Sequence, residues 1–398
     1  MSKTLLLKNV RPMAGDTVDI LIEHGLISKL AQNIVAPTVP TEDGGGRIVV
    51  PGLVEAHTHL DKSLLGMPWY RNNVGPELID KIENERAAKA TLGIDPARQS
   101  MRQALLSVAK GSTHIRSHVD IDTQYGVASV EGLLQTKDLL RDVVDIELVA
   151  FPQSGLLIRK GTVELMAQAL EMGVEVVGGI DPSGMDRDPK GHLDAIFKLA
   201  ERFGKPIDIH LHEAAELGAF SLELIIERTR ALSMQGRVTV SHAFCLGMPD
   251  AEYVHRLTTQ LAELQIHIVT TGPAARPAPA VSQLRKAGVV VGAGNDGIRD
   301  TWGPYGNADM LERAMFLGLR NNFRRDDEVE SALDVCTWGG SKVMGLQNYG
   351  LTSGCQADLV LLEGETLAEA VALHEPRALV IKRGAVVARQ GQALTPSP

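Results

Sequence analysis

The sequence predicts an α/β protein, a (β/α)8 TIM barrel with a small β-sandwich domain formed from both chain termini. Two observations lead to this fold class. About eight apolar, strand-like runs alternate with amphipathic helical stretches between residues 52 and 345, whereas short strand-like runs punctuated by glycine occupy both chain ends. Repeated strand–helix units are typical of a TIM barrel. We therefore expect a barrel over residues 51–345 and a β domain built from residues 1–50 plus 346–398.

The β domain is predicted from short strand-like runs, separated by turn residues, at the two ends of the chain. Turn-forming residues, Ala14-Gly15-Asp16 and His24-Gly25, break the N-terminal runs, and glycines separate ADLVLLEG, RALVIKRG and AVVARQG near the C-terminus. A small helix is expected near 368–374. The N-terminal strands are predicted at 3–10, 18–23, 26–30 and 47–50.

The barrel is predicted from alternating periodicities. A doubly wound sheet is the alternative, but the first strand is not followed by the glycine-rich phosphate turn which that fold would need. The predicted strands are 52–57, 113–119, 146–152, 174–180, 207–212, 238–242, 266–271 and 289–295, with helices at 96–110, 128–141, 160–172, 189–203, 217–233 and 250–264.

Composition narrows the class of partner. The chain has 398 residues and a net charge of -9, so binding to a nucleic-acid backbone is disfavoured. No apolar run approaches about 18 residues, the length that would span a membrane. The N-terminal apolar run is too short for a signal peptide, and Cys245, Cys336 and Cys355 form neither a metal spacing nor a disulfide framework. We expect a cytoplasmic protein acting on a small molecule, with homo-oligomerisation left open.

Histidines mark the predicted carboxyl ends of the barrel strands, which is where barrel enzymes place their chemistry. The first strand ends in His57-Thr58-His59. Because side chains alternate along a strand, His57 and His59 point the same way and can chelate one metal ion. The sequence therefore predicts a metal site at the barrel mouth.

Three more predicted strand ends carry ligand-type residues. One divalent cation can collect the His57/His59 pair, a histidine of the fifth strand and Asp296, with a position left for water. His212 shares the face of His210 by alternation, so the residues alone leave that choice open. The three strand ends are HLHE at 210–213, SH at 241–242 and ND at 295–296.

The metal count is predicted to be one. A two-metal site would need an acidic bridge, often a carbamylated lysine late in the fourth strand, and VEVVGGID carries no lysine. Lys62 lies beyond the first strand, and Asp181 is interpreted as a loop-capping residue before Pro182. His118 and Asp120 are expected to line the site without binding the metal. Ordinary structural roles are expected for His24, His114, His192, His255, His267 and His374.

These segments resemble the amidohydrolase superfamily. PGLVEAHTHLDKS is similar to its opening motif, and RSHVDID, LVAFPQSG, HLHE, VTVSHA and GNDGIRDTWGPYGNADML resemble its cytosine deaminase branch over essentially the whole barrel. The resemblance implies one iron or zinc ion per chain, held by His57, His59, His210 and Asp296.

The same segments are similar to enzymes that remove alkylamines from hydroxylated s-triazines of the N-isopropylammelide type, and AFPQSG and PYGNADM fit that group as well. In this resemblance Glu213 favours the deaminases, because the triazine enzyme carries aspartate there. Gly297 argues against strict cytosine specificity, because the cytosine enzymes tend to carry a second acidic residue at this position.

The resemblance also implies roles in the reaction. Asp296 would accept a proton from the attacking water, His242 would orient that water, and Glu213 would protonate a ring nitrogen and then the leaving amine. Gln153 would read the ring edge with its amide, and Trp302 would wall the pocket. The expected activity is hydrolytic deamination of a cytosine-like base or related cyclic amidine, with a triazine amine as the alternative.

Trp69 is a weaker candidate for stacking on the ring. Arg299 is an isolated cation that we expect to pair with Asp300, and the absence of a P-loop or arginine cluster argues against a phosphorylated substrate.

Overall fold

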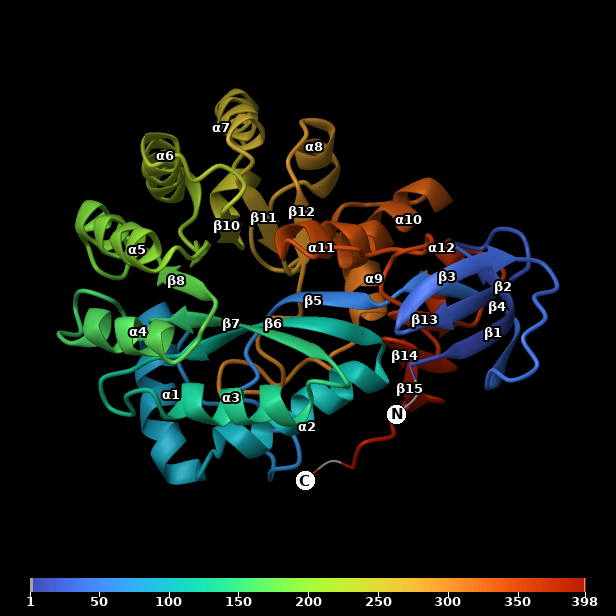
Figure 1. Cartoon of the computed structure of the whole chain (residues 1–398). Coiled ribbons are helices and arrows are strands. Elements are labelled where there is room, and N and C mark those ends of the chain that lie inside the picture. The colour runs from blue at the N-terminus through green and yellow to red at the C-terminus, as the bar shows by residue number, and fades with distance from the viewer. Residues whose placement is uncertain (1–2, 397) are drawn as a thin grey trace.

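The computed structural model describes residues 3–396 and 398, and its centre is an eight-stranded parallel sheet surrounded by helices (Figure 1). The strands follow one another in chain order from first to last, as in a TIM barrel. They are β5 (Leu53–Thr58), β6 (Ser112–Asp120), β7 (Asp145–Phe151), β8 (Val176–Ile180), β9 (Ile207–His210), β10 (Val238–Ser241), β11 (His267–Thr270) and β12 (Val291–Ala293).

The first and last strands approach each other at the carboxyl end. Thr58 and Asp296 form a parallel bridge, and the backbone N–H of Asp296 donates to the carbonyl of His57 at 2.9 Å. This contact nearly closes the barrel and confirms the predicted fold class. It also places the end of β12 against the first predicted metal-binding motif.

Helices follow the strands and pack around the outside of the barrel. Asp95 and Asp188 accept backbone N–H groups at the starts of α2 and α5, and a proline follows each of them, as expected of helix N-termini. The helices are α1 (Leu78–Leu92), α2 (Pro96–Ala109), α3 (Ala128–Leu139), α4 (Thr162–Glu171), α5 (Pro189–Phe203), α6 (Ala215–Ala231), α7 (Ala251–Glu263), α8 (Val281–Lys286), α9 (Met310–Arg320), α10 (Asp326–Asp334), α11 (Gly340–Val343) and α12 (Leu367–Leu373), with short 3-10 and π segments at Phe244–Gly247 and Val335–Gly339.

The strands of both chain ends form a second, mixed sheet beside the barrel (Figure 1). It is one sheet in the order β16-β15-β14-β13-β4-β1-β2-β3. Its strands are β1 (Leu5–Pro12), β2 (Val18–Glu23), β3 (Leu26–Ala31), β4 (Thr41–Pro51), β13 (Leu359–Leu362), β14 (Leu379–Lys382), β15 (Ala385–Arg389) and β16 (Gln392–Ala393).

This sheet encloses an apolar core of its own, to which strands from both chain ends contribute. In β13, Leu359 and Leu361 belong to that core, whereas Val360 and Leu362 belong to the large core of the barrel. The alternation of side chains along a strand therefore joins the two regions. Within the described residues, no helix is long and apolar enough to cross a membrane.

Candidate active site

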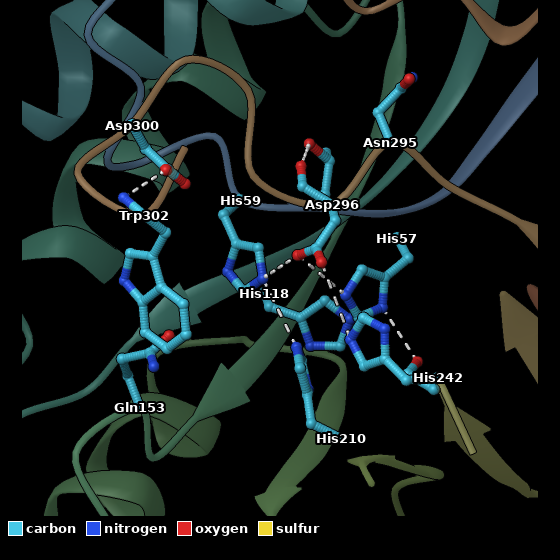
Figure 2. A network of polar contacts seen from close by, with 12 residues as sticks. His57, His59, His118, Gln153, His210, His242, Asn295, Asp296, Asp300 and Trp302 are labelled. Atoms are coloured by element: carbon cyan, nitrogen blue, oxygen red, sulfur yellow. Dashed lines mark hydrogen bonds and ion pairs between the residues drawn. The ribbon is translucent and has the colours of Figure 1, made fainter. Parts of the chain in front are cut away.

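Four imidazole rings gather at the carboxyl end of the barrel, those of His57 on β5, His118 on β6, His210 on β9 and His242 directly after β10 (Figure 2). The ring centre of His57 lies 4.2 Å from that of His118, 4.6 Å from that of His210 and 4.8 Å from that of His242. All four side chains are buried. His59 borders the group, with its ring centre 5.6 Å from that of His57.

Asp296 supplies a carboxylate to this cluster. Its Oδ1 lies 3.2 Å from His59 Nε2 and 3.7 Å from His57 Nε2, and its Oδ2 lies 4.0 Å from His242 Nε2. The residue adopts a left-handed backbone conformation with φ of 64°. Such strain in a residue that is not glycine is common at functional sites, and here it aims the side chain at the imidazoles.

The tautomer of His57 follows from its hydrogen-bond partners. Ser241 Oγ lies 2.9 Å from His57 Nδ1 and 2.7 Å from a carboxylate oxygen of Asp208. Because the carboxylate only accepts, the serine donates its single proton to Asp208 and accepts from His57 Nδ1. The tautomer with its proton on Nδ1 directs a bare Nε2 lone pair at the cluster, as a metal ligand requires.

The buried nitrogens without partners fit a metal ion. His57 Nε2, His210 Nδ1 and both ring nitrogens of His118 and His242 have no hydrogen-bond partner among residues 3–396 and 398. His210 Nε2 lies only 3.5 Å from His59 Nε2. Two ligand atoms that are each about 2.1 Å from one cation are separated by roughly this distance. Ligand atoms of His57, His59 and Asp296 lie within 4.8 Å of one another, and those of His57, His210 and His242 form a second such set, so these residues could hold a metal ion.

The electrostatics favour neutral imidazoles. Burial, reinforced by the positive charge of Lys62, lowers the pKa of His59 to about 4. Burial and the neighbouring imidazoles hold the pKa values of His118, His210 and His242 well below their usual range. Neutral imidazole is the form that binds metals, so these side chains are ready to act as ligands at neutral pH.

The structure shows that His210 and His212 have different positions and partners. The strand β9 ends at His210, so the expected alternation does not continue to His212. His212 instead holds Asp181 through Nδ1 at 2.7 Å and stacks on His242 with ring centres 4.4 Å apart. The charge of Asp181 outweighs burial and raises the pKa of His212. A raised pKa makes a proton compete more strongly with a metal ion for the ring of His212, and the geometry favours His210.

Glu213 lies at the cavity wall in a fixed orientation. Its Oε1 accepts the backbone N–H groups of Ser183 and Gly184, each at 2.7 Å, and its Oε2 accepts the hydroxyl of Ser221. It provides no side-chain cap for the start of α6. Burial raises the pKa of Glu213 in spite of these hydrogen bonds.

A cavity of about 890 Å³ opens above the cluster, and Gln153, Glu213 and Trp302 line it as expected. Gln153 is only 6% exposed, and its Oε1 accepts from Lys62 Nζ at 2.7 Å. Trp302 is half-buried, and its Nε1–H donates to Glu85. Trp69 is 63% exposed and does not line this cavity, so its expected stacking role is wrong.

Beside Gln153 lies a buried group of charges. Lys62 and Lys89 each contact both Asp120 and Glu85. Asp61 also belongs to it, because its Oδ2 accepts the backbone N–H of Asp120 at 3.1 Å.

Sequence reasoning missed Glu85. The only available signal was its place between Ile82 and Ala88 on the one buried face of α1. The expected ion pair between Arg299 and Asp300 is also wrong: Asp300 accepts the backbone N–H groups of Trp302 and Gly303 instead.

The barrel and the histidine-rich mouth define a hydrolase of the amidohydrolase type. The chain belongs to the amidohydrolase family, whose model matches residues 41–388. This confirms the resemblance inferred from the sequence motifs.

Three known proteins are similar to this chain in sequence or structure. The chain is 31% identical over 393 residues to N-isopropylammelide isopropyl amidohydrolase of Pseudomonas sp. strain ADP, covering 97% of each chain. The crystal structure of N-isopropylammelide isopropylaminohydrolase from Burkholderia multivorans ATCC 17616 superposes with a TM-score of 0.96 at 49% identity, covering 99% of this chain and 100% of that one. The 5-methylcytosine deaminase of Klebsiella pneumoniae, liganded with 5-fluorocytosine, gives a TM-score of 0.85 at 28% identity, covering 96% and 97%.

Proposed function

We propose that this protein is a metal-dependent hydrolase that removes an alkylamine or amine from a hydroxylated s-triazine of the N-isopropylammelide type. The observation that carries a hydrolytic metal site is the convergence of His57, His59, His210 and Asp296, with unpartnered nitrogens, below the cavity. The choice of ring is supported by 49% identity across the whole chain to the Burkholderia aminohydrolase, against 28% to the deaminase.

One divalent cation, zinc or iron, would be held by these four residues, and it would supply the Lewis acidity that activates a water molecule for attack. Asp296 lies where it can take the proton of that water. His242, whose Nε2 is 4.0 Å from Asp296 Oδ2 and has no hydrogen-bond partner in the part of the chain that the structure describes, can orient the same water.

Glu213 is proposed as the residue that moves a proton to the ring. Attack at a ring carbon bearing an amine places negative charge on the adjacent ring nitrogen, which needs a proton donor. A carboxyl group whose pKa is raised by burial retains its proton closer to neutral pH than an exposed one does. The same carboxyl can afterwards protonate the departing amine.

The volume and the lining of the cavity suit a ring with an alkyl substituent. Its volume of about 890 Å³ lies within the range of roughly 300–1,000 Å³ that is usual for small-molecule sites. Leu78, Leu217 and Phe244 give its wall apolar surface, while Gln153 and Asp300 provide polar groups. An isopropyl group can pack on the apolar part while the oxygenated ring faces the polar part.

A cytosine-type deaminase is the second candidate. Glu213 favours it, because the resemblance to the deaminases includes a glutamate at this position, and the 5-methylcytosine deaminase covers almost the whole chain. In either case the partner is a small heterocycle. We also propose a cytoplasmic setting, because Cys245, Cys336 and Cys355 are free thiols of the kind that persist in reducing compartments.

Amine release from a panel of rings tests this proposal. Purified protein, with its metal content measured, is incubated with N-isopropylammelide, ammelide, cytosine and 5-methylcytosine, and isopropylamine and ammonia are quantified. We expect the highest kcat/KM with N-isopropylammelide. Preference for 5-methylcytosine would select the second candidate, and no release from any ring would refute both.

A further inference from the structure

The charged side chains beside the cavity affect which hydrogen-bonding groups of a bound ring the site can contact. Lys62 Nζ is buried and has three partners: Gln153 Oε1 at 2.7 Å, Asp120 Oδ1 at 3.2 Å and Glu85 Oε2 at 3.3 Å. An ammonium group carries three hydrogens and accepts none. Each hydrogen of Lys62 therefore has an acceptor in the protein, and none is left for a ligand.

The contact with Lys62 fixes the orientation of the Gln153 amide. Oxygen and nitrogen of an amide are assigned from their partners. Since Lys62 only donates, the amide atom 2.7 Å from its Nζ has to be the oxygen. The Nε2 group of Gln153 makes no hydrogen bond among the described residues and is not among their buried atoms that lack partners, although Gln153 lines the cavity. The amide thus offers its N–H donors to the ligand.

We infer that Lys62 is a positioning residue that makes Gln153 a hydrogen-bond donor, so that the site selects rings presenting an acceptor there, either a carbonyl oxygen or an unprotonated ring nitrogen. This inference rests on the proposed function and narrows the set of rings that the site would bind. A glutamine amide can both donate and accept hydrogen bonds, but here Lys62 holds the oxygen and the amide group left without a partner is the donor. A ring whose N–H faces Gln153 is rejected, because two donors would meet in a desolvated pocket.

The decisive variant is Gln153→Glu, which keeps the shape of the side chain and its contact with Lys62 but replaces the donor with an acceptor. The probe is cyanuric acid, the trioxo ring left when the amine of N-isopropylammelide is replaced by oxygen, and its Kd is measured by calorimetry. We expect Gln153→Glu to weaken binding roughly 10–100-fold, since carboxylate and carbonyl oxygens repel each other. Unchanged or tighter binding would mean that Gln153 accepts, and would overturn the inference.

Lys62→Met tests the positioning step, with Lys89→Met as the matched control. Lys89 contacts the same two carboxylates, Glu85 and Asp120, but it does not contact Gln153. We expect Lys62→Met to weaken cyanuric acid binding several-fold, Lys62→Arg to restore most of it, and Lys89→Met to lower the Tm with little change in Kd. Equal loss of affinity in both methionine variants would show a purely structural role and overturn the inference.

The outcomes separate this inference from the proposed function. Wild-type turnover of N-isopropylammelide together with undiminished cyanuric acid binding by Gln153→Glu would overturn the inference alone. A wild-type protein that neither turns over N-isopropylammelide nor binds cyanuric acid would overturn both.

Discussion

Two clusters of buried polar side chains lie at opposite ends of the barrel strands, and they differ in how their atoms are satisfied. At the amino end, Lys382 of β14 donates to Asp358 at 2.7 Å, to Asp145 at 2.8 Å and to the carbonyl of Thr113 at 3.0 Å. None of these side chains is among the buried polar groups that lack a partner in the described structure. At the carboxyl end, several imidazole nitrogens around Asp296 have none.

The difference separates a structural cluster from a functional one. Leaving a buried polar atom unpaired costs about 1–3 kcal/mol, so stability alone would select against the carboxyl-end arrangement. The amino-end cluster joins the mixed sheet to the starts of β6 and β7 and completes its own hydrogen bonds. Both clusters contain three side chains that lie close enough together to bind a metal ion. At the amino end these are His114, Asp145 and Asp358, and the ammonium group of Lys382 already donates hydrogen bonds to both carboxylates.

The largest effect is expected from removing a proposed ligand at the carboxyl end. His57→Ala or Asp296→Ala should lose the bound metal and reduce amine release to background, because each removes one of the proposed ligands and water is no longer activated. Elemental analysis should find about one divalent metal per wild-type chain and much less in each variant. Two tightly bound metals, or full occupancy in both variants, would contradict the single-metal site.

Glu213→Gln should lower kcat by about 10²–10⁴-fold, the usual contribution of a positioned general acid. The fold, the metal content and the Kd for cyanuric acid should be preserved, because the glutamine oxygen can still accept the backbone N–H groups of Ser183 and Gly184. Steady-state kinetics on N-isopropylammelide provide the measurement. A variant that keeps more than about a tenth of the wild-type kcat would show that the proton comes from elsewhere.

Lys382→Met breaks the amino-end cluster and should act on stability instead of chemistry. It leaves Asp145 and Asp358 short of a buried partner, so the free energy of unfolding should fall by about 3–5 kcal/mol. Arg383 still contacts both residues, which places the expected loss at the lower end of that range. Urea unfolding measures the loss, and the metal content and kcat of the folded fraction should not change. A variant that loses its metal while remaining folded would contradict the division between the two clusters.

The free energy of unfolding should depend on pH through His114, which is buried in the amino-end cluster. Burial and the charge of Lys382 lower its pKa from 6.5 to about 4. Between these values the unfolded chain binds a proton that the folded chain does not, so this contribution to stability is complete above pH 6.5 and is lost as the pH falls toward 4. The loss should reach at most about 3 kcal/mol. His114→Gln should flatten this part of the pH profile measured by urea unfolding, and an unchanged slope would assign the loss to other groups.

The sequence by itself determined the order of the barrel strands and most of the helices. Apolar runs with a period of two and amphipathic runs with a helical period are local properties, and they place β9 and α5 within a few residues of their observed ends. The motifs at the strand ends also indicated the proposed ligands His57 and Asp296, because the carboxyl ends of barrel strands meet at one mouth.

Only the tertiary structure decided how the side chains at that mouth divide their roles. His210 faces the cluster and His212 holds Asp181 because β9 ends at His210, a fact that alternation along a strand cannot supply. His118 joins the imidazoles, although the sequence placed it only around them.

The contact between Lys62 and Gln153 is also set by the tertiary structure. The two residues are 91 positions apart in the chain, and they meet only because β5 and β7 end at the same side of the barrel. Local periodicity sets which residues reach the mouth, whereas hydrogen-bond partners depend on distances between segments that folding alone brings together.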